Sequence, residues 1–394
     1  MGSAAVIPTP RIPSTSGVCV SERSNGDSTD NLGESTEEYP EGGLRAWMVV
    51  LGAWCAMIPS MGMLNSLAIL EAWLSEHDLQ GIPKSTTGWV LSTYAFFLFF
   101  CGAQIGPIFD SYDVRWLIIP GSVGMIASMI CMSFSKEFYQ YLLSFGVLGG
   151  FQLPFSTIRD YPQLVTGFRK DVDLQRALPV HQARLPPNKK AGSSIDLKAL
   201  TDPMYGTITI ALVLVEFSIF IPISYISSYG LQSGFSHHQA YMLNAYLNAG
   251  AIPGRALPGY VADRFGVMNT MCAISFFCML FIFCLWYTAY GNQSMIISFA
   301  VLFGFWSGAS VSLAPVGIGL VCKTEDYGKR NGTAYTLASF GTLIGIPIGG
   351  ALLGAEGKAF QGLIIFSGAS YIFTLGAYFL GRGLLSRWRL STVC

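Results

Sequence analysis

Two charged residues lie inside stretches of the sequence that are otherwise apolar. Glu216 stands in LVLVEFSIF, and Arg255 stands in NAGAIPGRALPG. A charge within an apolar helix is costly, so such residues are rare and most often functional. A buried carboxyl such as Glu216 can bind a proton or orient a substrate, and the planar guanidinium of Arg255 matches a carboxylate. Two simpler interpretations stay open: a protonated Glu216 in a polar seam, and an Arg255 that reaches lipid headgroups.

Uncharged polar side chains form a second set of candidates. Amides within apolar stretches either hydrogen-bond a ligand or bridge two helices. Tyr225 and Tyr229 follow Pro222, where they can line an outer vestibule or belong to the aromatic belt at the membrane surface. The four amides are Asn65, Gln104, Asn244 and Asn248.

The sequence contains no pattern for catalysis, metal binding or a bound cofactor. A Walker loop, a Ser/His/Asp arrangement and an HExxH motif are all absent. His237 and His238 are adjacent, so they cannot bind a metal from one helix face as residues four apart can. We therefore expect no enzyme activity, no metal and no cofactor.

The composition is that of a membrane protein. Of the 394 residues, 52% are hydrophobic and only 12% are charged, whereas soluble domains carry roughly 25% charged residues. The formal net charge is zero, which gives no basis for binding nucleic acid. The lipid bilayer is therefore the first expected partner.

The apolar stretches predict an all-α fold with about ten spans, since a bilayer core needs about 20 apolar residues per helix. The predicted spans are 46–72, 87–109, 116–134, 138–157, 204–229, 239–261, 268–290, 295–322, 332–354 and 362–381.

The polar stretches between the spans divide the chain into five parts. Loops rich in Lys and Arg are expected on the cytoplasmic side. The central stretch is basic, whereas 230–238 and 291–294 contain no Lys or Arg, so we expect both termini in the cytoplasm, with the plasma membrane as the expected location. The parts are a disordered tail, 1–40; an N-terminal membrane half, 41–157; a cytoplasmic loop, 158–203; a C-terminal membrane half, 204–381; and a tail, 382–394.

One motif connects the pattern of spans with a known family. The stretch GYVADRFG, with Gly259, Asp263, Arg264 and Gly266, lies between the second and third spans after the central loop. It resembles the signature loop of the major facilitator superfamily, which gates the cytoplasmic side. We also expect its glycines to let backbones approach closely, and its charges to pair with neighbouring helix ends. The equivalent loop of the first half, GPIFDSYDVR, keeps Asp110 but has Ser where the motif has Arg.

Further stretches resemble the monocarboxylate-transporter-like branch of that superfamily, in its fungal form. EGGLRAW, 41–47, is similar to the opening of the first span in this branch. The resemblance implies alternating access for a carrier that imports a carboxylate or exports a secondary metabolite. It also implies that Arg255 binds the substrate carboxylate and that protons are coupled. The chain departs from the branch at Ala251, where an acid is usual, and at Asn65, where a Lys helps carry the proton.

The N-terminal half is shorter than this resemblance requires. The superfamily has two six-helix halves, but the first half here has about four spans, and on the order of 60 residues are missing. The missing fifth helix corresponds to the one with Gly341, Gly345 and Gly349, a Gly-x-x-x-Gly ladder that predicts close helix packing. Three explanations stay open: an altered transcript or gene prediction, a decayed relative, or a working carrier of reduced size. The alternative function is a membrane protein without transport activity, acting as a sensor or partner.

Overall fold

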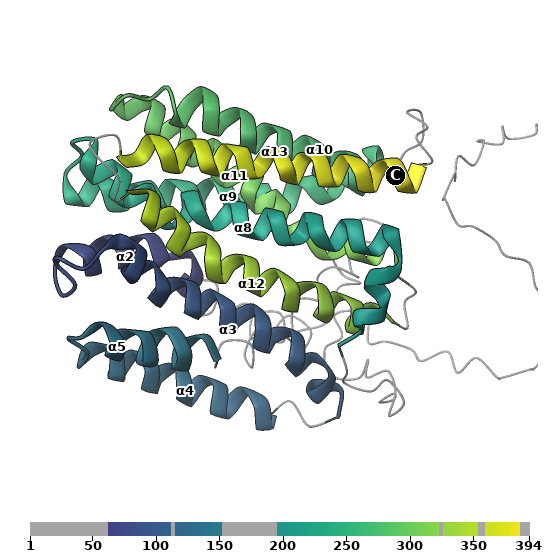
Figure 1. Cartoon of the computed structure of the whole chain (residues 1–394), viewed down its shortest axis with the longest axis horizontal. Helices are drawn as coiled ribbons and strands as arrows, with labels where there is room; N and C mark the ends of the chain where they lie inside the picture. The colour runs from purple at the N-terminus through teal and green to yellow at the C-terminus, as the bar shows by residue number, and fades with distance from the viewer. Residues whose placement is uncertain (1–61, 112–114, 152–194, 323–325, 354–358, 387–394) are drawn as a thin grey trace, which may run out of the picture.

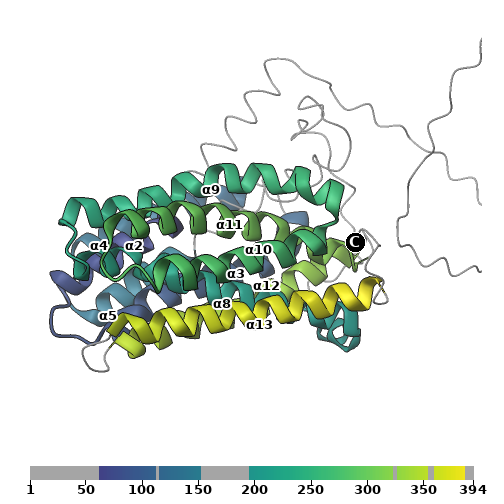
Figure 2. The same ribbon diagram turned by 90° about the horizontal axis from the view of Figure 1, so that it is seen from above.

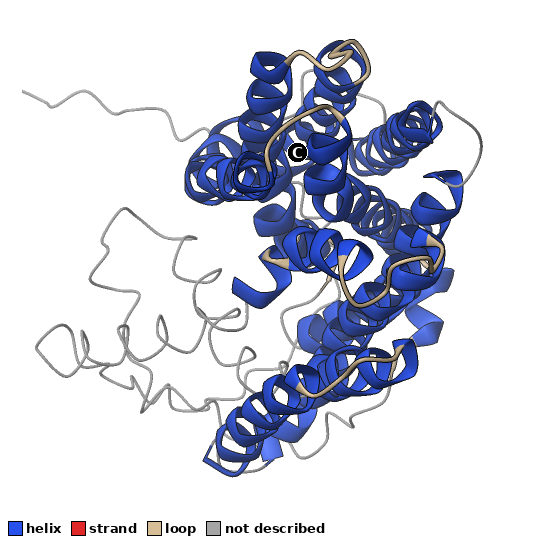
Figure 3. Ribbon diagram, turned by 90° about the vertical axis from the view of Figure 1, so that its left-hand side faces the viewer, coloured by secondary structure: helices blue, strands red, loops and turns tan. Residues whose placement is uncertain are grey.

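The computed structural model describes residues 62–111, 115–151, 195–322, 326–353 and 359–386. Within these ranges the chain is helical and contains no strand, as the helices in Figure 3 show, so the predicted all-α fold is confirmed. The expectations for the N-terminal tail, the start of the first span, most of the central loop and the last residues fall outside the described part.

Four helical segments form the N-terminal group. They occupy the stretches predicted for the first four spans, and they lie together at the lower side of Figure 1. The segments are α2 (Leu67–Glu76), α3 (Lys84–Ser111), α4 (Arg115–Ser133) and α5 (Phe138–Tyr141), which continues as the π-helix η1 (Leu142–Gly149).

Six long helices form the C-terminal group, preceded by the short 3₁₀ helix η2 (Leu197–Thr201). The side chain of Asp202 accepts a hydrogen bond from the Met204 amide, with Pro203 at the first position of the first long helix. The helices are α8 (Pro203–Gln232), α9 (His237–Phe265), α10 (Val267–Phe281) continuing as the π-helix η3 (Ile282–Trp286), α11 (Gln293–Gly319), α12 (Tyr327–Leu353) and α13 (Ala359–Ser386).

Five described helices are long and apolar enough to cross a bilayer: α8, α10 with η3, α11, α12 and α13. The 29-residue helix α9 is not among them, because it carries amides, histidines and charged residues. Polar residues within a membrane helix are expected to face the bundle interior. Helix α9 is therefore the element to search for a polar site.

The two groups meet along α3 and α12, which lie side by side (Figures 1 and 2). Phe96 of α3 packs edge to face against Phe340 of α12. Near one end, a Cβ added to Gly350 would lie 2.7 Å from the Cα of Ser85. Helix α2 also packs against α8. We call the end of the bundle with the turns at 77–83 and 233–236 the turn end; the C-terminal end of α13 lies at the opposite end.

Glycines permit two very close helix contacts inside the C-terminal group. Helices α9 and α11 touch backbone to backbone: a Cβ added to Gly254 would overlap the Phe305 carbonyl, and one added to Gly304 would overlap the Leu247 carbonyl. The ladder predicted from sequence faces α8. A Cβ at Gly341 would lie 3.1 Å from the Val213 carbonyl oxygen, one at Gly345 3.2 Å from that of Phe217, and one at Gly349 3.0 Å from the Tyr225 ring.

Replacing Gly254 with Ala is expected to destabilise the fold by about 1–3 kcal/mol, the usual cost of overpacking, because the new methyl group has no room beside α11. Thermal or denaturant unfolding of the purified protein in detergent measures this change. Gly259→Ala is the matched control, since it changes the same helix at a position where a Cβ meets no atom within 4 Å. Equal stability of the two variants would contradict the backbone contact between α9 and α11.

Candidate functional site

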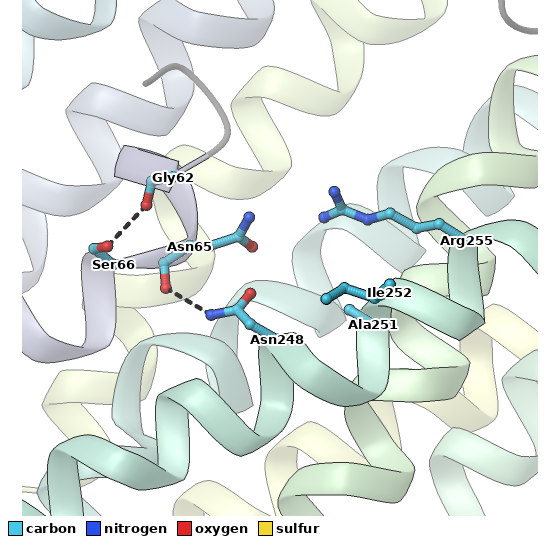
Figure 4. A pocket seen from close by; sticks show the side chains of 7 residues that line it. All are labelled: Gly62, Asn65, Ser66, Asn248, Ala251, Ile252 and Arg255. Carbon is cyan, nitrogen blue, oxygen red and sulfur yellow. Dashed lines mark hydrogen bonds between the residues drawn. The ribbon is translucent and has the colours of Figure 1, made fainter. Parts of the chain in front are cut away.

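A cavity of about 330 Å³ lies between the start of the described N-terminal group and the middle of α9. Its lining is mostly apolar, with amides and one positive charge facing one another across it (Figure 4). The lining residues are Gly62, Asn65, Ser66, Asn248, Ala251, Ile252 and Arg255. The cavity is therefore shared by the two groups of helices.

A break in the helix next to the cavity creates its hydrogen-bonding groups. The backbone turns at Ser66 (φ −95°, ψ 2°) before α2 begins, and the Ser66 hydroxyl donates to the Gly62 carbonyl at 2.8 Å. The Asn65 carbonyl accepts from the Asn244 side-chain amide at 2.6 Å and from that of Asn248 at 3.4 Å. Of the two interpretations of these amides, Asn244 and Asn248 fit the helix-bridging one, and Asn248 also lines the cavity.

Arg255 supplies the positive charge of the cavity. Its guanidinium points from α9 towards the Asn65 side chain (Figure 4). Among the described residues it forms no ion pair and no hydrogen bond. Ala251, one turn earlier on α9, provides no carboxylate to neutralise it. A planar guanidinium in a partly apolar cavity is suited to binding a carboxylate through two parallel hydrogen bonds.

Glu216 lies away from this cavity. It is buried in α8 and does not belong to the cavity lining. Its carboxyl is close enough to interact electrostatically with the Tyr371 and Tyr378 hydroxyls of α13. The structure thus places Glu216 inside the C-terminal group and does not bring it together with Arg255.

Tyr225 and Tyr229 are both buried between helices. The Tyr225 hydroxyl donates to the Ile346 carbonyl of α12 at 2.8 Å. Tyr229 packs edge to face against Trp286 and Phe360. Neither ring is exposed as an aromatic of the membrane-surface belt would be, and neither lines the cavity.

The glycines of the motif GYVADRFG have different surroundings. Gly266 has φ +88° and joins α9 to α10, a left-handed conformation that strongly favours glycine. The expectation of close backbone approach is wrong at Gly259, where an added Cβ meets no atom within 4 Å. The requirement for glycine at Gly266 comes from the turn.

The charges of the motif are exposed. The guanidinium of Arg264 stacks over the ring of Tyr260 at 4.6 Å. Within the described residues neither Asp263 nor Arg264 forms an ion pair, so the expected pairing with neighbouring helix ends is not seen there. Asp110 falls near the end of α3, and its side chain, like that of Gln104, lies outside the described part.

One buried acid is not among the candidates predicted from the sequence. Glu71 in α2 is fully buried, and the Ser228 hydroxyl of α8 donates to it. The signal was present in LAILEAW, an acid inside a predicted span, and the rule applied to Glu216 also covers it. Nδ1 of His237 lies 3.3 Å from a carboxylate oxygen of Glu76 and forms an ion pair with it when the imidazole is protonated. The described residues contain no group of three metal-ligating side chains.

Comparisons with known proteins agree with this architecture. The sequence pattern of the Major Facilitator Superfamily matches residues 206–391. Riboflavin transporter MCH5 of Saccharomyces cerevisiae is 30% identical over 427 residues, which cover 90% of this chain and 81% of the relative. MFS transporter asaE of Aspergillus flavus is 30% identical over 398 residues, covering 88% of this chain and 89% of the relative.

Two further proteins extend the comparison. Aspyridones efflux protein apdF of Emericella nidulans is 29% identical over 384 residues, covering 86% of this chain and 78% of the relative. Among solved structures, a mutant of nucleoside transporter NupG superposes with a TM-score of 0.64 at 12% identity, covering 81% of this chain and 95% of that one. At that identity the likeness concerns the fold alone.

Asn244→Ala is expected to weaken the connection between the two groups of helices, because it removes the 2.6 Å hydrogen bond to Asn65 from a buried position. Such bonds between membrane helices contribute about 0.6 kcal/mol on average and about 1.7 kcal/mol at most. Unfolding of the purified protein measures it. Asn248→Ala, which changes the same helix and removes the longer 3.4 Å bond to Asn65 together with a 3.0 Å bond to the Asn244 carbonyl, is the control. A larger loss in the control would contradict the assignment.

Proposed function

Because this chain belongs to the major facilitator superfamily, we propose that it is a secondary active transporter for a small organic anion, such as a monocarboxylate. In this fold two helical halves rock about a site near the middle of the membrane, which opens to each side in turn. The observation that carries the proposal is the guanidinium of Arg255, which points into a cavity between the two groups of helices.

The cavity favours an anion for reasons of charge. Arg255 provides the only charge among the described residues of its lining, and the amides of Asn65 and Asn248 add groups that hydrogen-bond oxygen atoms. A bound carboxylate would neutralise the guanidinium and form two parallel hydrogen bonds with it. The apolar part of the substrate would lie against Ala251 and Ile252.

The arrangement also supports membership in the monocarboxylate-transporter-like branch. The resemblance implies that, in that branch, the residue at the position of Arg255 binds the substrate carboxylate and a Lys at the position of Asn65 helps carry the proton. These two side chains face each other across the cavity here (Figure 4). Since Asn65 and Ala251 cannot carry a proton, a proton coupled to transport must bind elsewhere.

The direction of transport is a second part of the proposal. One relative is named as a riboflavin transporter and another as an aspyridones efflux protein. We propose uptake of a carboxylate, with export of a secondary metabolite as the second candidate because of the efflux relatives. The turn end faces outward and both termini face the cytoplasm, because 230–238 contains no Lys or Arg. The plasma membrane is the proposed location.

The other residues singled out from the sequence receive separate roles. Gly259, Asp263, Arg264 and Gly266 form the proposed gate at the cytoplasmic side, with Asp110 as its counterpart in the first half. Tyr225 stiffens the contact between α8 and α12 through its bond to Ile346. Glu216 is proposed as a proton-binding carboxyl of the C-terminal half, without contact to the substrate.

The alternative is a carrier that no longer transports and acts as a sensor or partner, and its support is the short N-terminal half expected from the sequence. Ninety per cent of the 394 residues is about 355, so roughly 70 of the 427 positions compared with the riboflavin transporter have no counterpart in this chain. Taken together, these positions correspond in number to about two membrane helices with their loops.

Sequencing of the transcripts across codons 145 to 190 tests this alternative. If the protein is a complete carrier in the cell, the messages will contain an extra segment that encodes two further apolar helices. If only the present form exists, the alternative becomes the leading function, and transport must be shown with the shortened chain itself.

Arg255→Ala is expected to reduce transport of lactate, a simple monocarboxylate, at least tenfold in reconstituted vesicles, mainly through a higher KM. Arg255→Lys should recover only part of the activity, because an ammonium lacks the planar fork. Lys136→Ala, which removes an exposed positive charge away from the cavity, controls for net charge. Full lactate transport by Arg255→Ala would exclude its role in binding.

A further inference from the structure

Glu71 combines burial with an incomplete set of partners. Its side chain is fully buried, the Ser228 hydroxyl donates to Oε2, and Oε1 has no hydrogen-bond partner among the described residues. An ionised carboxylate in such a place is costly, whereas a neutral carboxyl tolerates burial far better. The site can therefore hold a proton as long as it stays closed.

The partner of Glu71 belongs to the other group of helices. Glu71 is on α2, and Ser228 is on α8. When the two groups separate at the turn end, Glu71 loses this hydroxyl and gains water. Its affinity for a proton must then differ between the closed and the open arrangement. A ligand shifts a conformational equilibrium only through such a difference.

Glu216 lacks this property, although it is equally buried. Its neighbours Tyr371 and Tyr378 belong to the same group of helices as Glu216 itself. Rocking of one group against the other leaves these neighbours in place, so the proton affinity of Glu216 changes little with that motion.

The surroundings of Glu71 contain further charges that an experiment must separate from it. They come from the same helix and from the helices packed against it. Lys84 of α3 is close enough to attract the ionised carboxylate of Glu71. Glu76 and the Tyr225 hydroxyl also interact electrostatically with Glu71. The groups to consider are Glu76 on α2, Lys84 on α3, Tyr225 on α8, and His237 and Tyr241 on α9, the last two through Glu76.

We propose that Glu71 is the proton-binding site that couples protonation to closure of the turn end. The proton bound on Glu71 favours the closed arrangement, in which the carboxyl is buried against Ser228. Release of the proton favours opening, because the ionised group then reaches water. The role of Glu71 as the coupling site of a carrier rests on the function proposed above. Its role as a proton-sensitive contact between the two groups of helices does not depend on that function.

The test uses the full chain in lipid nanodiscs, with the proton as the only ligand. Spin labels that do not require cysteine are placed at Gln80 and Gln232, two exposed residues at the turn end. The distance between them is then measured as a function of pH. In the parent protein we expect a longer-distance population to grow several-fold as the pH rises. In Glu71→Gln, whose amide oxygen can still accept from Ser228, the size of the longer-distance population should no longer change with pH.

Glu76→Gln is the matched control, since it makes the same chemical change on the same helix and removes the ion pair with His237. It should keep the pH response. A response that persists in Glu71→Gln, or that disappears in Glu76→Gln or in Glu216→Gln instead, would overturn the proposal.

Lactate transport in vesicles separates the proposal from the proposed function. Exchange of lactate in both directions should persist in Glu71→Gln, while accumulation driven by a proton gradient should fall at least tenfold. If the parent protein moves no lactate but its turn end responds to pH through Glu71, the transport proposal fails and the proton site stands. Normal accumulation in Glu71→Gln would overturn the coupling role.

Discussion

The structure depends on the need to satisfy backbone hydrogen bonds away from water. Inside a bilayer each carbonyl needs a donor from the protein, so the chain is helical, and breaks occur only next to a cavity or within the protein. The break at Ser66 follows this rule. The carbonyl of Asn65 receives the side-chain amides of Asn244 and Asn248 from α9. The same two bonds connect the groups of helices and define one side of the cavity.

Small residues decide where helices can meet closely. Glycines bring the backbones of α9 and α11 into contact, and the ladder at Gly341, Gly345 and Gly349 lets α12 lie against α8. At the contact between α3 and α12, aromatic rings such as Phe96 and Phe340 pack against each other, and Gly350 lets the two backbones approach closely. Lipid provides no hydrophobic driving force between helices, so this close packing and a few polar contacts hold the bundle together.

The sequence predicted the helices well because length and apolar character determine a span almost without reference to the rest of the chain. It also placed Asn65, Asn248 and Arg255 among the candidates, since polar side chains in apolar stretches are few. It could not show that Glu216 lies apart from Arg255, because which way a side chain faces depends on the helices around it. Glu71 was overlooked although the same rule covers it, and Gly259 and Gly266 look alike in the motif while only Gly266 adopts a left-handed turn.

The contact between α9 and α11 has a mechanical consequence. Arg255 projects from one side of α9, while Gly250 and Gly254 on that helix fit against the backbone of α11 without room for a methyl group. Sliding or rolling of α9 on α11 is therefore opposed, because such a displacement drives backbone atoms into one another. A movement of α9 that follows binding at the guanidinium is thus expected to carry α11 with it.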